Sequence, residues 1–375
     1  MVDKKLSGAG LRGQSAGETA LCTVGKTGSG LTYRGYDIKE LADKAQFEEV
    51  AYLLLYGKLP NQAELDAYKA RLKSMRALPE ALKTVLEQIP ADAHPMDVMR
   101  TGCSMLGNLE TENDFSEQHD HIDRMLAVFP GMINYWYNFS HNGTRVNVET
   151  DADSIAEQFL WTLHDKKPEP LHVEVMHASL NLYAEHEFNA STFTARVCAS
   201  TLSDIHSCVT AAIGSLRGPL HGGANEAAME MIENWRSADE AEAEIMGMLE
   251  RKDKIMGFGH AIYRESDPRN AIIKEWSKKL SDQVGDEYLY DVSDRVEAVM
   301  WREKKLFCNA DFFHASAYNF MGIPTKLFTP IFVCSRAAGW TAHVMEQRAN
   351  NRIIRPSADY TGPETAEWVD IADRD

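Results

Sequence analysis

The sequence contains no apolar run of the roughly 18 residues that a membrane-spanning helix needs. Its opening stretch, MVDKKLSGAGLRG, also lacks the apolar core of a secretory signal. Cysteines are few and scattered without a CxxC pair, which favours free thiols in a reducing, cytoplasmic compartment. The cysteines are Cys22, Cys103, Cys198, Cys208, Cys308 and Cys334.

Positive charge is scarce as well. The chain has 39 Lys and Arg residues against 56 Asp and Glu residues, which gives a net charge of -17. Nucleic acids and anionic membranes bind broad basic surfaces, so neither is an expected partner. A small anionic substrate stays compatible with this charge, because a local basic cluster can survive inside an acidic protein. HExxH does not occur, which argues against a zinc protease.

Two short patterns resemble other sites but fit simpler interpretations. Gly8, Gly10 and Gly13 spell GxGxxG, yet no strand precedes them, so dinucleotide binding is not predicted. Cys308 lies close in sequence to Asp311, where a small buried thiol is favoured over a cysteine nucleophile.

The stretch ENDFSEQHDHID gathers His119, Asp120, His121 and Asp123. These are metal-ligand types, but the surrounding sequence is polar and acidic. A solvated loop and helix start is therefore favoured over a metal site.

Most of the chain predicts helices. Apolar residues recur with helical spacing in residues 47–54, 98–109 and 228–235, and the first of these helices ends at Gly57 and Pro60. Residues 62–75 and 121–138 are further helical candidates. By contrast, ETALCTV and LTYRGYDI flank GKTGSG, which predicts a β-hairpin. Strands and helices do not alternate, so the sequence predicts an all-α fold with one short N-terminal hairpin.

Two histidines stand on glycine-rich turns that interrupt the helical pattern. His221 lies in GPLHGGANE, just before a predicted helix with Asn225 as its N-cap. The positive end of that helix disfavours imidazolium, so His221 is expected to be a neutral hydrogen-bond donor. His260 lies in GFGHAIYRESDPR, close to Arg264 and Arg269. Arginine side chains bind carboxylates through two parallel hydrogen bonds, so these residues indicate an anionic substrate.

Asp311 follows in NADFF, between an alanine and two phenylalanines. An apolar setting raises the basicity of a carboxylate, and nearby cations lower it. Arg336 is expected just ahead of a helix in CSRAAGWTAHVMEQ. The breaks at the His221 and His260 turns and at 322–330 bracket a smaller unit of roughly 100 residues. Two histidines, one acid and several arginines together indicate proton transfer on an anionic substrate.

The motifs GPLHGGANE, GFGHAIYRESDPR, NADFF and SRAAGWTAHVMEQ occur in an order that resembles the citrate synthase family. The similarity covers nearly the whole chain, and NADFFHASAYNFMGIPTKLFTPIFVCSR is most similar to the bacterial 2-methylcitrate synthase branch. The resemblance implies an all-helical fold with a large domain, residues 1–220 and 318–375, and a small domain, residues 221–317. It also implies a homodimer without the N-terminal regulatory region of longer, hexameric members.

The same resemblance implies condensation of a short acyl-CoA with oxaloacetate, followed by thioester hydrolysis. The CoA thioester is then a substrate, and neither a tightly bound cofactor nor a metal is expected. Asp311 would remove the α-proton, His221 would donate to the thioester oxygen, and His260 would polarise the oxaloacetate carbonyl. Propionyl-CoA is the expected acyl donor, and a citrate synthase using acetyl-CoA is the alternative. A metal-dependent lyase or hydrolase and a non-catalytic helical binding module are the remaining hypotheses.

The resemblance further assigns substrate contacts. His186, Arg269 and Arg336 would bind oxaloacetate, and Arg355 would reach the site from the partner subunit. The expected CoA contacts are Lys254, Ile255, Met256, Gly257, Phe258, Gly259 and Arg264.

Overall fold

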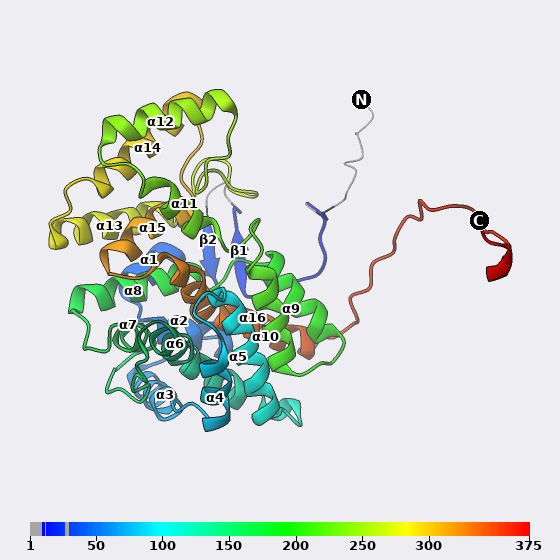
Figure 1. Ribbon diagram of the computed structural model, residues 1–375. Coiled ribbons are helices and arrows are strands. Elements are labelled where there is room, and N and C mark those ends of the chain that lie inside the picture. Colours follow the sequence, from blue (N-terminus) through cyan, green and yellow to red (C-terminus); the bar gives the residue numbers. More distant parts are fainter. Residues whose placement is uncertain (1–9, 12, 27–29) are drawn as a thin grey trace.

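The computed structural model describes residues 10, 11, 13–26 and 30–375 (Figure 1). The predicted hairpin is present: β1 (Cys22–Val24) pairs antiparallel with β2 (Leu31–Tyr33). A third strand, β3 (Tyr36–Asp37), continues this small sheet on the other side of β2 and was not predicted. The hairpin turn at 27–29 lies outside the described residues, as does Gly8 of the GxGxxG pattern.

Helices make up most of the remaining described chain. The first half contains α1 (Ile38–Lys44), α2 (Phe47–Tyr56), α3 (Gln62–Ser74), α4 (Glu80–Gln88), α5 (Pro95–Leu109), α6 (Gln118–Asn142), α7 (Ile155–His164) and α8 (Pro170–Tyr183). The second half contains α9 (Ala190–Ser200), α10 (Ile205–Leu216), α11 (Ala224–Ile232), α12 (Ala238–Arg251), α13 (Asn270–Val284), α14 (Leu289–Lys304), α15 (Ala310–Phe320) and α16 (Phe328–Ala349). The all-α prediction is confirmed. No helix among the described residues is long and apolar enough to cross a membrane.

Local chemistry explains several helix ends. Gly57 ends α2 in the left-handed conformation with φ 83°, as the sequence predicted. The prediction of Asn225 as an N-cap was wrong, because Gly223 occupies that position and Asn225 lies in the first turn of α11. Arg336 was expected ahead of a helix but lies inside α16, which already begins at Phe328.

The 119–123 stretch matches the predicted helix start, but not all of it is solvated. It is part of helix α6 and its start, and Asp123 is fully buried against the guanidinium of Arg71 at 2.8 Å. His119 stacks on Tyr56 with ring centroids 4.7 Å apart. The solvated-loop interpretation therefore fails for Asp123, which is a buried ion-pair partner. Among the described residues, no three His, Cys, Asp or Glu side chains gather as a group that could hold a metal ion.

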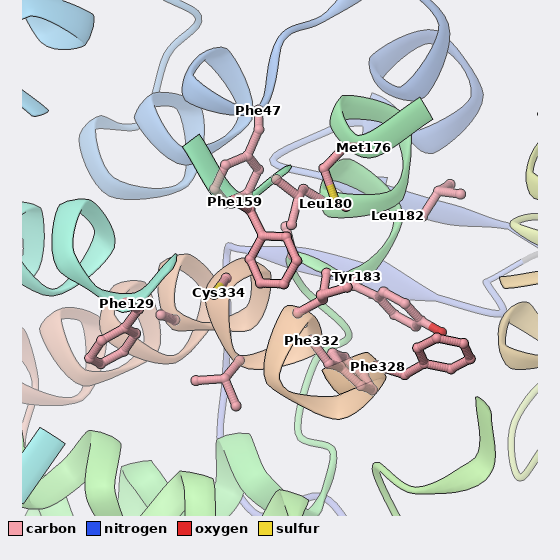
Figure 2. Close-up of a cluster of buried hydrophobic side chains, with 14 of the residues drawn as sticks. Phe47, Phe129, Phe159, Met176, Leu180, Leu182, Tyr183, Phe328, Phe332 and Cys334 are labelled. Atoms are coloured by element: carbon pink, nitrogen blue, oxygen red, sulfur yellow. The ribbon is translucent and has the colours of Figure 1, made fainter. Parts of the chain in front are cut away.

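The core forms around α16. This helix is buried along nearly its whole length and packs against α2, α6, α8, α9 and α10. Figure 2 shows Phe328, Phe332 and Cys334 of α16 among the side chains of Phe159 and Leu180. Each fully buried side chain of this size contributes roughly 1.5–3 kcal/mol, so this packing fixes where the polar residues of α16 can point.

Helices α11 to α15 form a second group, where α12 packs on α14 and α13 packs on α15 (Figure 1). Beyond α16 the chain leaves the body as an extended arm that ends in a short 3₁₀ turn, Ile371–Asp373. Large apolar side chains on the arm, including Tyr360 and Trp368, are about four-fifths exposed, at 79 % and 81 %.

At one position, helix α16 packs unusually closely against the loop after α8. A Cβ atom added to Gly339 of α16 would lie 2.2 Å from the carbonyl oxygen of Ala184. Only glycine permits this contact, because a backbone oxygen cannot move aside as a flexible side chain can.

We therefore predict that Gly339→Ala destabilises the protein by about 1–3 kcal/mol, as overpacking of a rigid contact does. The control is Gly247→Ala in α12, where the added methyl meets only the flexible end of Arg251 at 3.1 Å. That change is expected to be neutral or to stabilise by up to ~1 kcal/mol. Urea unfolding of both variants checks the prediction, and equal stabilities would contradict it.

Candidate active site

A cleft of about 940 Å³ brings most of the predicted site together. It lies where α15, α16, the loop after α8 and the two glycine-rich turns meet. Six predicted residues line it: His186, His221, His260, Arg269, Asp311 and Arg336. These residues are far apart in sequence, so their convergence comes from the tertiary fold.

Asp311 lies in the first turn of α15, where the side chain of Asn309 caps the helix by accepting from the Asp311 N–H at 3.0 Å. The Tyr183 hydroxyl donates a hydrogen bond of 2.6 Å to its carboxylate. Burial raises the pKa of Asp311, and the Tyr183 bond and the positive charge of Arg269 oppose this rise. The result is a carboxylate more basic than usual, which suits a general base.

His221 has a defined tautomer. The Ser191 backbone N–H donates to its Nε2 at 3.3 Å, and the Ser191 hydroxyl lies 2.8 Å from the same atom. A backbone N–H can only donate, so Nε2 is unprotonated and the ring proton is on Nδ1. Burial, followed by the charge of Arg336, lowers the pKa of His221 to about 4. The neutral donor expected from the sequence is supported, and burial is the main cause of its low pKa.

His260 has the opposite tautomer. Its Nδ1 accepts from the backbone N–H groups of Ile262 at 3.1 Å and Tyr263 at 3.3 Å, which leaves the proton of the neutral ring on Nε2. The rings of His260 and His186 lie 5.1 Å apart. Burial, and then the charge of Arg269, holds the pKa of His186 well below its usual value. His186 is therefore neutral, and its Nε2 lies 3.0 Å from the Tyr263 hydroxyl.

Two buried arginines supply positive charge to the cleft. Asp267 holds Arg269 through two side-chain bonds of 3.0 and 2.8 Å. Burial alone lowers the pKa of Arg269, but Asp267 outweighs this effect and raises it overall. Arg336 donates from Nε to the Tyr183 carbonyl oxygen at 2.5 Å and lies over the Phe332 ring at 4.7 Å. Each guanidinium is thus fixed by part of its donor set, and the remainder is available to an anion.

The glycine-rich loop before His260 is pinned to the start of α15. The Asn309 N–H donates to the Gly257 carbonyl oxygen at 2.9 Å, and the Asn309 side chain donates to the Gly259 carbonyl oxygen at 3.0 Å. Gly257 has φ 87°, and a Cβ there would lie 2.9 Å from the Cβ of Phe312. Of the seven expected CoA contacts, only Gly259 lines the cleft, while Lys254 and Arg264 are exposed to solvent. Their role stays a prediction.

Arg355 does not reach the cleft of its own chain. It lies exposed at the root of the C-terminal arm, where its Nη1 donates to the carbonyl oxygen of Pro356 at 3.2 Å. It lines a second cavity of about 1220 Å³ that also contains Arg196 and Glu346. This placement leaves the predicted role in a partner subunit open.

Sequence reasoning missed three residues of the site. Tyr183 and Ser191 carried no signal, because they meet Asp311 and His221 only in the fold. Asp267 was missed as well, although an acid two residues before Arg269 can chelate it. For Cys308, burial raises the pKa of the thiol, which agrees with a buried thiol and not a nucleophile.

This combination of a basic carboxylate, neutral histidine donors and buried arginines defines a site for carbanion chemistry on an anionic substrate. The family model described as citrate synthase, C-terminal domain, matches residues 10–357, and the chain belongs to the citrate synthase family. It is 72 % identical to the 2-methylcitrate synthase of Shewanella oneidensis, over 99 % of both chains. It is also 45 % identical to citrate synthase 2 of Bacillus subtilis, over 92 % of this chain and 93 % of that protein.

Solved structures agree with this assignment. The citrate synthase of Thermoplasma acidophilum, in a ternary complex with carboxymethyl coenzyme A and oxaloacetate, superposes on this chain with a TM-score of 0.89 at 31 % identity. The superposition covers 97 % of this chain and 98 % of that one. The Thermotoga maritima citrate synthase gives a TM-score of 0.86 at 34 % identity, over 98 % and 99 % of the two chains. The citrate synthase fold expected from the sequence is confirmed.

We predict that Tyr183→Phe moves the acidic limb of the pH–rate profile to higher pH. Burial already raises the pKa of Asp311, and the Tyr183 bond lowers it, so losing the bond raises it further. A base works only when ionised, so turnover falls at low pH and recovers on the alkaline side. The matched control is Tyr135→Phe, which removes a 2.8 Å bond to Glu87 on α4. An acidic limb that stays in place in Tyr183→Phe would contradict the prediction.

Proposed function

We propose that this chain condenses propionyl-CoA with oxaloacetate and water to give 2-methylcitrate and free CoA. One observation carries the proposal: a chain 72 % identical to a 2-methylcitrate synthase places Asp311, His221 and His260 around one cleft. The roles below are assigned by motif and by the tautomers and charges of the site.

Proton removal comes first. Asp311 takes a proton from the carbon next to the thioester carbonyl, and its burial supplies the basicity this step needs. Negative charge then develops on the thioester oxygen. His221 donates to that oxygen from Nδ1, because Ser191 occupies its Nε2. A neutral donor is suitable because it stabilises the enolate without first losing a charge to solvent.

Carbon–carbon bond formation follows at the oxaloacetate ketone. His260 donates from Nε2 to the ketone oxygen and passes its proton to the alkoxide as the new bond forms. Water then attacks the thioester carbonyl, and the carbon–sulfur bond breaks to release CoA as the thiol. The balance is one propionyl-CoA, one oxaloacetate and one water consumed for each 2-methylcitrate and CoA.

Oxaloacetate is a dianion, and the cleft offers matched cations. Arg269 and Arg336 would each bind a carboxylate with the donors that Asp267 and Tyr183 leave available. His186, neutral and buried, would donate a further hydrogen bond. Arg355 would complete the site from the partner subunit, since in its own chain it lies outside the cleft.

The chain is proposed to work as two domains. The small domain is proposed to comprise 221–317, so that its C-terminal boundary falls within α15. CoA would lie against Lys254–Gly259 and Arg264 at the edge of this unit. Closure of the two domains would exclude water from the enolate.

A homodimer is proposed from two observations. Every half-exposed or exposed position within α9 and α10 is uncharged, whereas a solvated helix carries a charged face. The arm beyond Arg355 exposes Tyr360, Trp368 and Ile371, which are side chains that protein interfaces favour. The enzyme is also proposed to be cytoplasmic, in keeping with six free cysteines.

Acetyl-CoA is the alternative acyl donor. One methylene in an apolar pocket discriminates by only about 1–3 kcal/mol, and the chain is 38 % identical to a citrate/2-methylcitrate synthase of Bacillus subtilis. The lyase or hydrolase hypothesis is tested by metal analysis of the purified protein, where stoichiometric metal needed for turnover would favour it. A binding module without catalysis would show no turnover at all.

The first test is oxaloacetate-dependent release of CoA thiol. We expect thiol release with both acyl donors. The kcat/KM should be about ten times higher, or more, for propionyl-CoA than for acetyl-CoA, because the preference has to come from the one methylene by which the two donors differ. No release with either donor would contradict the condensing activity, and a preference for acetyl-CoA would assign citrate synthesis instead.

The second test is Asp311→Asn, which keeps the shape of the side chain and removes the base. Turnover should fall by about 10²–10⁴-fold while the melting temperature changes little. Thiol-release kinetics and thermal unfolding measure the two quantities. Full activity in this variant would place the base elsewhere.

The third test asks whether Arg355 acts in the partner's site. Asp311→Asn and Arg355→Ala proteins, each expected to be nearly inactive, are unfolded together and refolded as a mixture. In a mixed dimer, one site then contains both intact residues, so about a quarter of the wild-type activity should return. If Arg355 served its own subunit, every site would carry one defect and no activity would return.

A further inference from the structure

Behind the oxaloacetate side of the cleft lies a buried polar row that the proposed mechanism does not use. It consists of Glu185, His343, Arg196 and Glu346, contributed by the loop after α8, by α16 and by α9. Glu185 and His343 are fully buried, and their Oε1 and Nε2 atoms are 2.9 Å apart. Buried charge of this kind is costly unless each member has its partner, so the row needs an explanation.

The tautomer of His343 follows from its second neighbour. Arg196 Nη1 lies 2.9 Å from His343 Nδ1, and a guanidinium has donors only. Nδ1 therefore accepts, and the ring proton is on Nε2, which faces Glu185. Arg196 is held in turn by Glu346, at 2.7 Å, and Glu346 accepts from the Ala20 N–H at 2.9 Å. The row thus gives His343 one fixed orientation.

Glu185 has two positively polarised neighbours that face it. Burial raises the pKa of Glu185, but His343 and then Arg336 lower it overall, so the carboxylate is ionised. Arg336 is the substrate-binding arginine of the proposed site, and Glu185 is the residue next to His186 in the chain. The other described contacts of the Glu185 side chain are the Glu187 N–H, at 2.9 Å, and the thiol of Cys22.

We propose that His343 is a positioning residue for the oxaloacetate side of the site. It lies against the Glu185 carboxylate, 2.9 Å away, which keeps the loop carrying His186 in place and keeps Glu185 from capturing Arg336. Without His343, Arg336 is the remaining positive charge that acts most strongly on Glu185. That arginine would then turn toward a protein carboxylate in place of the substrate's carboxylate. This inference rests on the proposed function for the identity of the anion.

The test compares His343→Leu, which removes both ring nitrogens, with His343→Gln, whose amide can still donate to Glu185. The Leu variant should raise the KM for oxaloacetate about tenfold or more, the size expected for one hydrogen bond to a charged group. Its kcat and its KM for propionyl-CoA should stay close to wild type. The Gln variant should restore most of the lost affinity, which a purely structural role would not require.

A second change tests whether the loss of affinity comes from the unpaired negative charge of Glu185. Adding Glu185→Gln to His343→Leu removes the unpaired carboxylate, so part of the oxaloacetate affinity should return. The control is Thr341→Val, a buried residue of the same helix that bonds only to carbonyls of α16, at 2.7 and 3.2 Å. It should leave both KM values unchanged.

Calorimetric titration with oxaloacetate gives an affinity that does not depend on turnover. A wild-type protein that binds oxaloacetate but releases no thiol would contradict the proposed reaction and leave the role of His343 measurable. An active wild type with the same oxaloacetate affinity and KM in His343→Leu would overturn the positioning role. A Leu variant that fails to fold shifts the decision to His343→Gln, where a rise in both KM values equally would overturn it.

Discussion

The contact between α16 and the loop after α8 is the constraint on which the site depends. Gly339 lets the Ala184 carbonyl oxygen approach the helix more closely than any side chain would allow. This approach places His186 near Arg336. Through Trp340, which donates to the Ser191 hydroxyl at 3.0 Å, the same helix also fixes the partner of His221. One buried helix therefore aligns both substrate sides of the cleft.

The charge states of the residues in the cleft depend on their burial more than on the acidic composition of the whole chain. The chain is strongly acidic, yet Arg269 and Arg336 are buried there with carboxylates placed behind them. Asp267 chelates Arg269, whereas Glu185 lies 2.9 Å from His343 and is also stabilised as an anion by the charge of Arg336. Desolvation keeps His186 and His221 neutral and makes Asp311 more basic. A dianionic substrate would thus meet cations, neutral donors and one base, each already in the required protonation state.

The sequence predicted the helical class and the hairpin, because periodicity and turn residues are local signals. Short motifs indicated five residues of the cleft, whereas His186 was named only through the family resemblance. The sequence could not predict Tyr183 beside Asp311 or Ser191 beside His221, since those contacts join distant segments. Local signals also misled in places. Asn225 is a favourable cap residue, but the helix starts one residue before it, and the polar stretch around Asp123 conceals a buried ion pair with Arg71.

The central claim is that Asp311 removes a proton from the acyl carbon of a short CoA thioester. Deuterium exchange measures this step alone. Propionyl-CoA is incubated in D₂O with the protein and an oxaloacetate analogue that lacks the ketone, and mass spectrometry follows label at the α-carbon. The account predicts steady incorporation by the wild type and none above background by Asp311→Asn. Equal incorporation by both proteins, or none by the wild type, would contradict it.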